Sequence, residues 1–249
     1  MPPVNSYDDR AGARPGVSVS GGGVDPHWSV ENESSRGSGR LEAFSDAVIA
    51  IMLTVLTLRL LEFDPRAIER EGLAYALLRQ WPSYLAFLLT FLVVGQVWVT
   101  HHNLWRYITR VDQGLLIINL VLLFFVTVIP LAARLLAEGI KSPTTADGRL
   151  AVGCYAAMSL GQAMSFNFGL WWARRRGLLS GKMGDDLYCA VRRRFLIGPS
   201  IYLFALLVDL ISPWISLLSY LGVIALYIWP GPGDLPSTDN IISGQKSAR

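Results

Sequence analysis

The chain has 249 residues, of which 52% are hydrophobic and 16% are charged, and its formal net charge is +3. This composition is too apolar for an ordinary soluble domain. We therefore expect an all-α, polytopic membrane protein, which contacts membrane lipid and does not bind nucleic acid.

The two ends of the chain differ in composition from the middle. Residues 1–38 are rich in Gly, Ser and Pro and have no apolar period, which predicts a disordered N-terminal tail. This segment also lacks the basic start and continuous apolar core of a secretory signal. Residues 231–249 are predicted to form a disordered C-terminal tail. Residues 39–230 are then expected to form the membrane domain.

Six segments of the middle part are apolar over about the 20 residues that a helix needs to cross a bilayer. They cover residues 44–61, 82–100, 115–136, 150–172, 195–211 and 213–229. The fourth segment is diluted by glycine and by polar residues, which are common where membrane helices pack on each other. We expect six transmembrane helices.

Arginine and lysine are retained on the cytoplasmic side of short loops. With the N-terminus inside, fifteen of them lie on the cytoplasmic side and six on the other, while Arg59 falls within the first span. This bias predicts a multi-pass protein of the cell membrane with both termini in the cytoplasm. The basic connection of residues 173–194 fits a topology signal better than a binding site for anionic headgroups.

The first span carries a stripe of residues spaced three or four apart, which places them on one helical face. The stripe consists of Ala47, Ile51, Thr54, Leu58 and Leu61. It can line an aqueous path or only pack against another helix. The Thr54 hydroxyl can also bond to the carbonyl of Ala50 in its own helix and then needs no functional explanation.

A carboxylate begins the same span. Asp46 lies in the first turn, where exposed N–H groups and the helix dipole favour a negative charge. This benefit does not offset the cost of a charge near hydrocarbon, so a cationic partner is expected. Arg40 reaches Asp46 only if the chain bends, and His101 or His102 is the other candidate.

The paired histidines His101 and His102 could indicate a membrane enzyme, but the chain has too few histidines for one. Di-iron membrane enzymes need many imidazole or carboxylate ligands, whereas this chain has three histidines, one of which is His27 in the tail. A proton relay and an interfacial hydrogen-bonding pair both remain open. Cys154 and Cys189 differ in predicted depth, so we expect no disulfide, and we expect no metal site, no cofactor and no enzyme.

These residues carry a resemblance to a known family. The stretch "RLEAFSDAVIAIMLTVL" resembles the first helix of the bacterial branch of the transmembrane protein 175 family of potassium channels. The following tryptophan, paired histidines, asparagine and proline occur in the family's order, and the likeness covers residues 40–136 closely. It implies a homotetramer in which four copies of the first helix line a central pore.

The resemblance also implies roles for single residues. Ile51 would form the hydrophobic constriction, Thr54 the hydroxyl layer that prefers potassium, and Leu58 the next apolar ring. The predicted polar cluster at the cytoplasmic end of the pore helix consists of Arg40, Phe44, Ser45, Asp46, and His101 or His102.

The implied function is a potassium-preferring cation channel without a carbonyl-type filter, which closes by dewetting and selects modestly. The chain departs from the family at Arg59, where a glutamate is usual. We expect Arg59 to extend toward headgroups and Glu62 or Asp64 to supply the outer negative potential. A secondary transporter or proton-coupled cation permease is the alternative, although inverted repeats and broken helices are not evident.

Overall fold

The computed structural model describes residues 26–58, 60 and 65–228, and this part of the chain is helical apart from its connections. The helices are α1 (Pro26–Leu58), α2 (Pro65–Glu71), α3 (Leu73–Arg79), α4 (Trp81–Trp105), α5 (Gln113–Lys141), α6 (Ala146–Arg175), α7 (Asp185–Asp209) and α8 (Pro213–Ile228). The all-α prediction is therefore confirmed for the described residues. The short helices α2 and α3 lie in the connection between the first two predicted spans and were not predicted.

Each of the six predicted spans coincides with one of the other helices. Within the described residues, three segments are long and apolar enough to cross a membrane by length and composition, namely 37–58, 81–105 and 113–141. Helices α6 and α7 contain more polar residues, and α8 has only 16 described residues. The number of six spans therefore stays a prediction.

Helix α1 begins at Pro26, so residues 26–38 are helical where the sequence predicts a disordered tail. Proline suits the first position of a helix because its missing N–H is not needed there. No further proline interrupts the chain before Pro65. The remaining tail residues lie outside the described part of the chain, as does Arg59.

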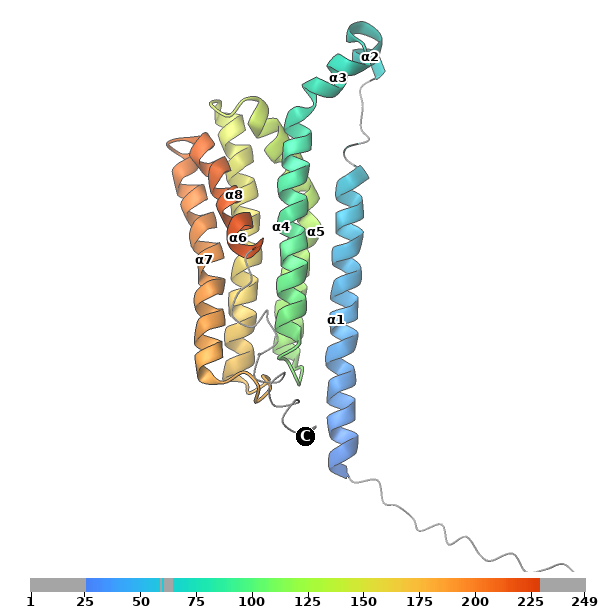
Figure 1. Ribbon diagram of the computed structural model, residues 1–249, viewed down its shortest axis with the longest axis vertical. Helices are drawn as coiled ribbons and strands as arrows, with labels where there is room; N and C mark the ends of the chain where they lie inside the picture. Colours follow the sequence, from blue (N-terminus) through green and yellow to red (C-terminus); the bar gives the residue numbers. More distant parts are fainter. Residues whose placement is uncertain (1–25, 59, 61–64, 229–249) are drawn as a thin grey trace, which may run out of the picture.

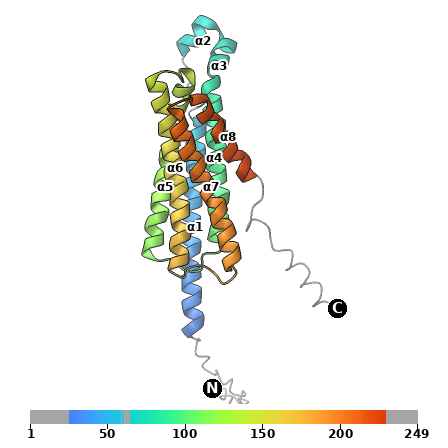
Figure 2. The ribbon, with the colours of Figure 1, turned by 90° about the vertical axis from the view of Figure 1, so that its left-hand side faces the viewer.

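The long helices run side by side in one bundle (Figures 1 and 2). Helix α5 packs against α4 and α6, and α7 packs against α6 and α8, while α1 lies at the edge of the bundle and contacts α4 and α5 (Figure 1). We name the two ends of the bundle by α5. The Gln113 end is where α5 begins and α4 ends, and the Lys141 end is where α5 ends and α4 begins.

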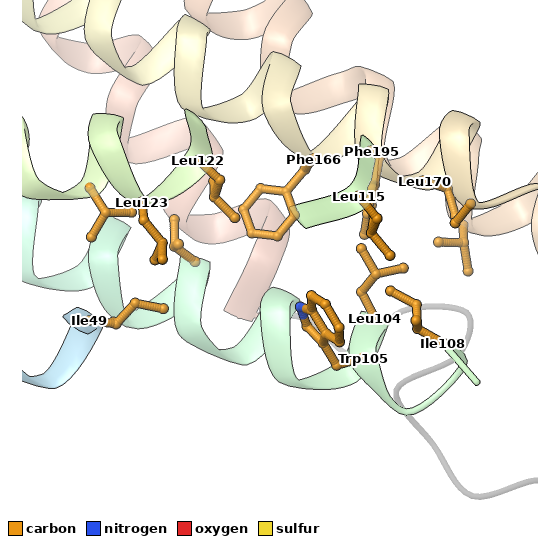
Figure 3. Packing of buried hydrophobic residues seen from close by; sticks show 14 of the residues in the cluster. Ile49, Leu104, Trp105, Ile108, Leu115, Leu122, Leu123, Phe166, Leu170 and Phe195 are labelled. Atoms are coloured by element: carbon orange, nitrogen blue, oxygen red, sulfur yellow. The ribbon is translucent and has the colours of Figure 1, made fainter. Parts of the chain in front are cut away.

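Two hydrophobic clusters hold the bundle together. The first lies toward the Gln113 end and includes Ile49 of α1, which points toward Leu123 of α5 (Figure 3). The second lies toward the Lys141 end and is centred on Tyr155 of α6 and Tyr220 of α8. The second cluster contains residues of α4 to α8 and, among the described residues, none of α1. The hydrophobic core therefore holds α1 through its middle and its Gln113 end.

The connections at the Gln113 end are tied to each other. An isolated β-bridge joins Ile108 to Leu179. Asp112 caps α5 by accepting from the Leu115 N–H at 2.8 Å and also accepts from Trp172 Nε1 and Arg176 Nε. Burial alone would raise the pKa of Asp112, but these hydrogen bonds and the Arg176 charge outweigh it and lower the pKa. This end of the bundle is fixed by polar contacts as well as by packing.

Candidate functional site

Helix α1 has one face toward its own bundle and one face away from it. The buried face holds Ser45, Ile49 and Leu56, which are at most 2% exposed. Ile51 and Leu58 are 57% and 56% exposed, and Thr54 is exposed too. At about 100° per residue the centres of the two sets lie roughly 190° apart around the helix. The four described members of the predicted stripe, Ala47, Ile51, Thr54 and Leu58, therefore lie on the face that the subunit leaves uncovered, while Leu61 lies outside the described residues.

The Thr54 hydroxyl makes the local hydrogen bond that the sequence allows. Its Oγ1 donates to the carbonyl of Ala50 at 2.9 Å, and Thr57 bonds to Leu53 in the same way at 3.1 Å. This bond uses the only proton of the Thr54 hydroxyl and leaves both lone pairs of its oxygen free to accept. An exposed oxygen that can only accept is suited to contact a cation, so local bonding and ion contact are compatible at Thr54.

A buried polar network joins α1 to α4 and α5 near the Gln113 end. Asn119 Nδ2 donates to Ser45 Oγ at 2.9 Å, and Ser45 in turn donates to the Leu41 carbonyl. Asn119 Oδ1 lies 3.2 Å from Nε2 of His101, which is only 1% exposed. Because the amide oxygen only accepts, His101 Nε2 must carry the proton and donate. Nδ1 of His101 has no partner among the described residues.

The charged members of the predicted cluster are arranged differently from the expectation. His102 Nδ1 lies 3.1 Å from Oε1 of Glu42, so its partner is Glu42 and not Asp46. Asp46 forms no hydrogen bond with His101, and its Oδ1 is buried without a hydrogen-bond partner in the described part of the chain. Position along the helix axis explains the difference, because Glu42 and Asp46 lie four residues apart on nearly the same face and Asp46 is one turn deeper along α1.

Two further members of the predicted cluster do not join the network. Arg40 is exposed and forms no ion pair with another described residue. Phe44 is 50% exposed and lies away from the bundle. The structure therefore brings together Ser45 and His101 through Asn119, places Asp46 beside them, and leaves Arg40 and Phe44 on the open side of α1.

Two residues of the site were not found from the sequence. Asn119 is the only carboxamide between Gly114 and Lys141, in the most apolar of the three candidate spans, and this isolation was a signal that could have been used. Glu42 has no such signal, because an acidic residue near the membrane surface is ordinary. No group of three or more His, Cys, Asp or Glu side chains that could hold a metal ion occurs among the described residues.

The chain is similar to several known proteins. A family model described as endosomal/lysosomal potassium channel TMEM175 matches residues 40–130. A protein of Chamaesiphon minutus named as a potassium channel is 36% identical over 200 residues, which cover 80% of this chain and 96% of that protein. A protein of Streptomyces collinus that is also named as a potassium channel is 35% identical over 192 residues. These residues cover 76% of this chain and 90% of that protein.

A solved structure supports the same relationship. The crystal structure of a protein described as a lysosomal potassium-selective channel TMEM175 homolog from Chamaesiphon minutus superimposes with a TM-score of 0.67. The match has 32% sequence identity and covers 78% of this chain and 97% of that one.

Proposed function

The chain belongs to the TMEM175 family of ion channels, and we propose that it forms a potassium-preferring cation channel in the cell membrane. The proposed channel is a homotetramer of six-span subunits with both termini in the cytoplasm. Under this topology the Gln113 end of the bundle is cytoplasmic and the Lys141 end faces outward. The relatives that are named as potassium channels support potassium as the permeant ion.

The observation that carries the proposal is the uncovered face of α1. Ile51, Thr54 and Leu58 point away from the bundle of their own subunit, and α1 lies at its edge (Figure 1). One helix cannot enclose a pore, whereas several copies related by a rotation axis can bring the same stripe together around that axis. Four stripes then give successive rings of Ile51, Thr54 and Leu58 along one path.

The chemistry of the three rings fits a gated, weakly selective path. Rings of isoleucine and leucine side chains close a pore by excluding water, without a separate plug. The Thr54 ring offers one acceptor oxygen per subunit, because the hydroxyl proton is donated to the carbonyl of Ala50. Such a ring replaces only part of the hydration shell of an ion, so potassium is preferred over sodium by a small factor.

A secondary transporter or proton-coupled cation permease remains the alternative. The buried His101 favours it, since a histidine in a polar network is a candidate for carrying a proton. Coupled transport is slow and saturable, and its flux depends on the gradient of the second ion. A channel gives unitary currents whose reversal potential follows the potassium and sodium gradients alone.

Reconstitution in planar bilayers with unequal potassium and sodium tests the proposal. We expect a cation current with a reversal potential that indicates a modest potassium preference. Thr54→Val should change this potential, whereas Thr57→Val should not, although Thr57 is also an exposed threonine with a local hydrogen bond. A reversal potential that ignores both cation gradients, or no current from folded protein, would refute the channel.

A second pair of variants tests the constriction. Ile51→Asn should hydrate the ring and make the channel leaky in the closed state. Ile117→Asn is the matched control, because Ile117 on α5 is 54% exposed, close to the 57% of Ile51, and lies on another helix. Equal leak in the two variants would show that general damage, and not the proposed ring, causes the current.

A further inference from the structure

A cavity of about 200 Å³ lies between α1, α4 and α5 at the Lys141 end. Its apolar wall includes Leu56 of α1, Phe87 of α4 and Pro130 of α5. Its polar wall includes Arg134, Glu138 and Lys141, all exposed residues of α5, so the cavity is open to the surroundings on that side. The space equals the share of about seven liquid water molecules. Its lining is apolar on one side and charged on the other, which suits an amphiphile.

The charges in the cavity do not cancel. Lys141 Nζ donates to Glu138 Oε1 at 2.8 Å, which neutralises these two residues. Arg134 forms no ion pair or hydrogen bond with another described residue, so no acidic side chain within the described part of the chain neutralises its guanidinium. Arg134 lies seven residues before the end of α5, about 10 Å along the helix axis. The predicted third span ends at residue 136, so Arg134 lies near the membrane surface, where its side chain can extend to the headgroups and meet an anion.

We infer that the cavity binds an anionic phospholipid of the outer leaflet, with Arg134 holding its phosphodiester. This inference rests on the proposed function for the topology that places the Lys141 end outside. A guanidinium forms two parallel hydrogen bonds to phosphate oxygens. The acyl chain lies along Leu56, Phe87 and Pro130. A free phosphate would satisfy Arg134 equally well but would leave this apolar wall exposed to water.

The bound lipid acts on the back of the pore helix. Leu56, which lines the cavity, is 2% exposed, whereas Leu58 is 56% exposed on the opposite side of α1. A molecule that fills this cavity therefore prevents α1 from moving back toward the bundle and keeps the Leu58 ring close to the pore axis. The lipid favours the closed ring, and its loss raises the open probability.

Binding is tested on the purified full-length protein in a neutral detergent, by the rise of the unfolding temperature with added ligand. The probes are dioctanoylphosphatidylglycerol, dioctanoylphosphatidylcholine and inorganic phosphate. We expect phosphatidylglycerol to raise the temperature with saturation, phosphatidylcholine to do so less, and phosphate to have no effect. Equal effects of the two lipids would refute the requirement for an anionic lipid, and an effect of phosphate would refute the lipid as the occupant.

Variants test whether this cavity is the site. Arg134→Gln should weaken the apparent affinity for phosphatidylglycerol about fivefold, the loss expected for one arginine at an anionic headgroup. Arg70→Gln is the matched control, because Arg70 is an exposed arginine in the last turn of α2 and does not line the cavity. Ala137→Phe should fill the cavity and abolish the shift while Arg134 remains. An unchanged affinity of Arg134→Gln would overturn the site.

Current recordings test the effect on the gate separately. In phosphatidylcholine bilayers, addition of phosphatidylglycerol should lower the open probability of the wild type and of Arg70→Gln but not of Arg134→Gln. Saturable binding without this difference would overturn the coupling to the gate and leave the channel intact. Absence of current in every variant would refute the proposed function, whereas the binding measurement still tests the cavity.

Discussion

Asn119 offers the most direct test of how α1 is held. Replacement of Asn119 by leucine removes the hydrogen bonds to Ser45 and His101, which link α5 to α1 and α4. Ser45 keeps its donor bond to Leu41 and loses only an accepted bond. His101 loses the acceptor of its Nε2 proton in a site where the side chain is 1% exposed. The main cost of Asn119→Leu therefore falls on His101.

The size of this cost follows from two competing effects. Hydrogen bonds between membrane helices contribute only about 0.6 kcal/mol on average, because the unfolded chain in the bilayer also finds partners. A buried donor left without an acceptor in a packed structure costs more, about 1–3 kcal/mol. We expect the second effect to dominate in Asn119→Leu. His101→Phe should cost a similar amount, since it leaves the amide oxygen of Asn119 unpaired.

The double variant separates these effects. With His101→Phe and Asn119→Leu together, no donor or acceptor of this pair remains, and the phenyl ring meets Trp105 and Phe166, whose rings already lie 5.4 Å and 6.4 Å from the imidazole. We therefore expect the double variant to be more stable than either single variant. Reversible unfolding in mixed micelles measures the three free energies. A loss in the double variant equal to the sum of the single losses would refute the reasoning.

Three further predictions concern stability and use the same unfolding measurement. Glu42→Gln should cost less than about 1 kcal/mol, since the side chains of His102 and Glu42 are 48% and 28% exposed, and a larger loss would show that the pair is stronger than an ordinary surface pair. Gly148→Ala should cost about 1–3 kcal/mol, because the added Cβ would collide with the backbone oxygen of Ser142, whereas Gly153→Ala on the same helix meets only an ordinary contact of 3.4 Å and should not destabilise. The lowered pKa of Asp112 means that its ionised form is favoured by folding, so this stabilisation is complete above the ordinary value of 3.8 and is lost as the pH falls below it. Asp112→Asn should remove that part of the acid dependence, and an unchanged acid profile would contradict the assignment.

Much of the fold follows from the sequence because hydrophobic length and helical period are local properties. The period of α1 separates Ile49 and Leu56 from Ile51 and Leu58 without knowledge of any partner helix. The α2 and α3 helices were not predicted because each has only seven residues, too few for a clear period. The assignment of Ile51, Thr54 and Leu58 to a pore stays a prediction, since a single subunit shows only that this face is uncovered.

The contacts of the polar network could not be derived in the same way. Ser45 and Asn119 are separated by 74 residues, and their hydrogen bond depends on how α1 and α5 are rotated against each other. The expectation for Asp46 considered the cationic residues nearest to it in sequence or in depth. In the structure His102 instead pairs with Glu42, which lies one helical turn before Asp46. The cavity at Arg134 is still less accessible to sequence reasoning, because it arises where three helices fail to fill the space between them.

The distribution of these contacts along α1 determines which proposed ring can move. The helix is held at Ser45 by the polar network and at Ile49 by the hydrophobic core, whereas near Leu56 it borders the cavity. The part of α1 beyond these contacts, toward Leu58, can tilt about them. Ile51 lies six residues beyond Ser45 and Leu58 thirteen, about 9 Å and 20 Å along the axis, so a given tilt displaces the Leu58 ring roughly twice as far. The Leu58 ring is therefore the one that a ligand behind α1 can hold closed, while the Ile51 ring, near the fixed part of the helix, keeps its width more nearly constant.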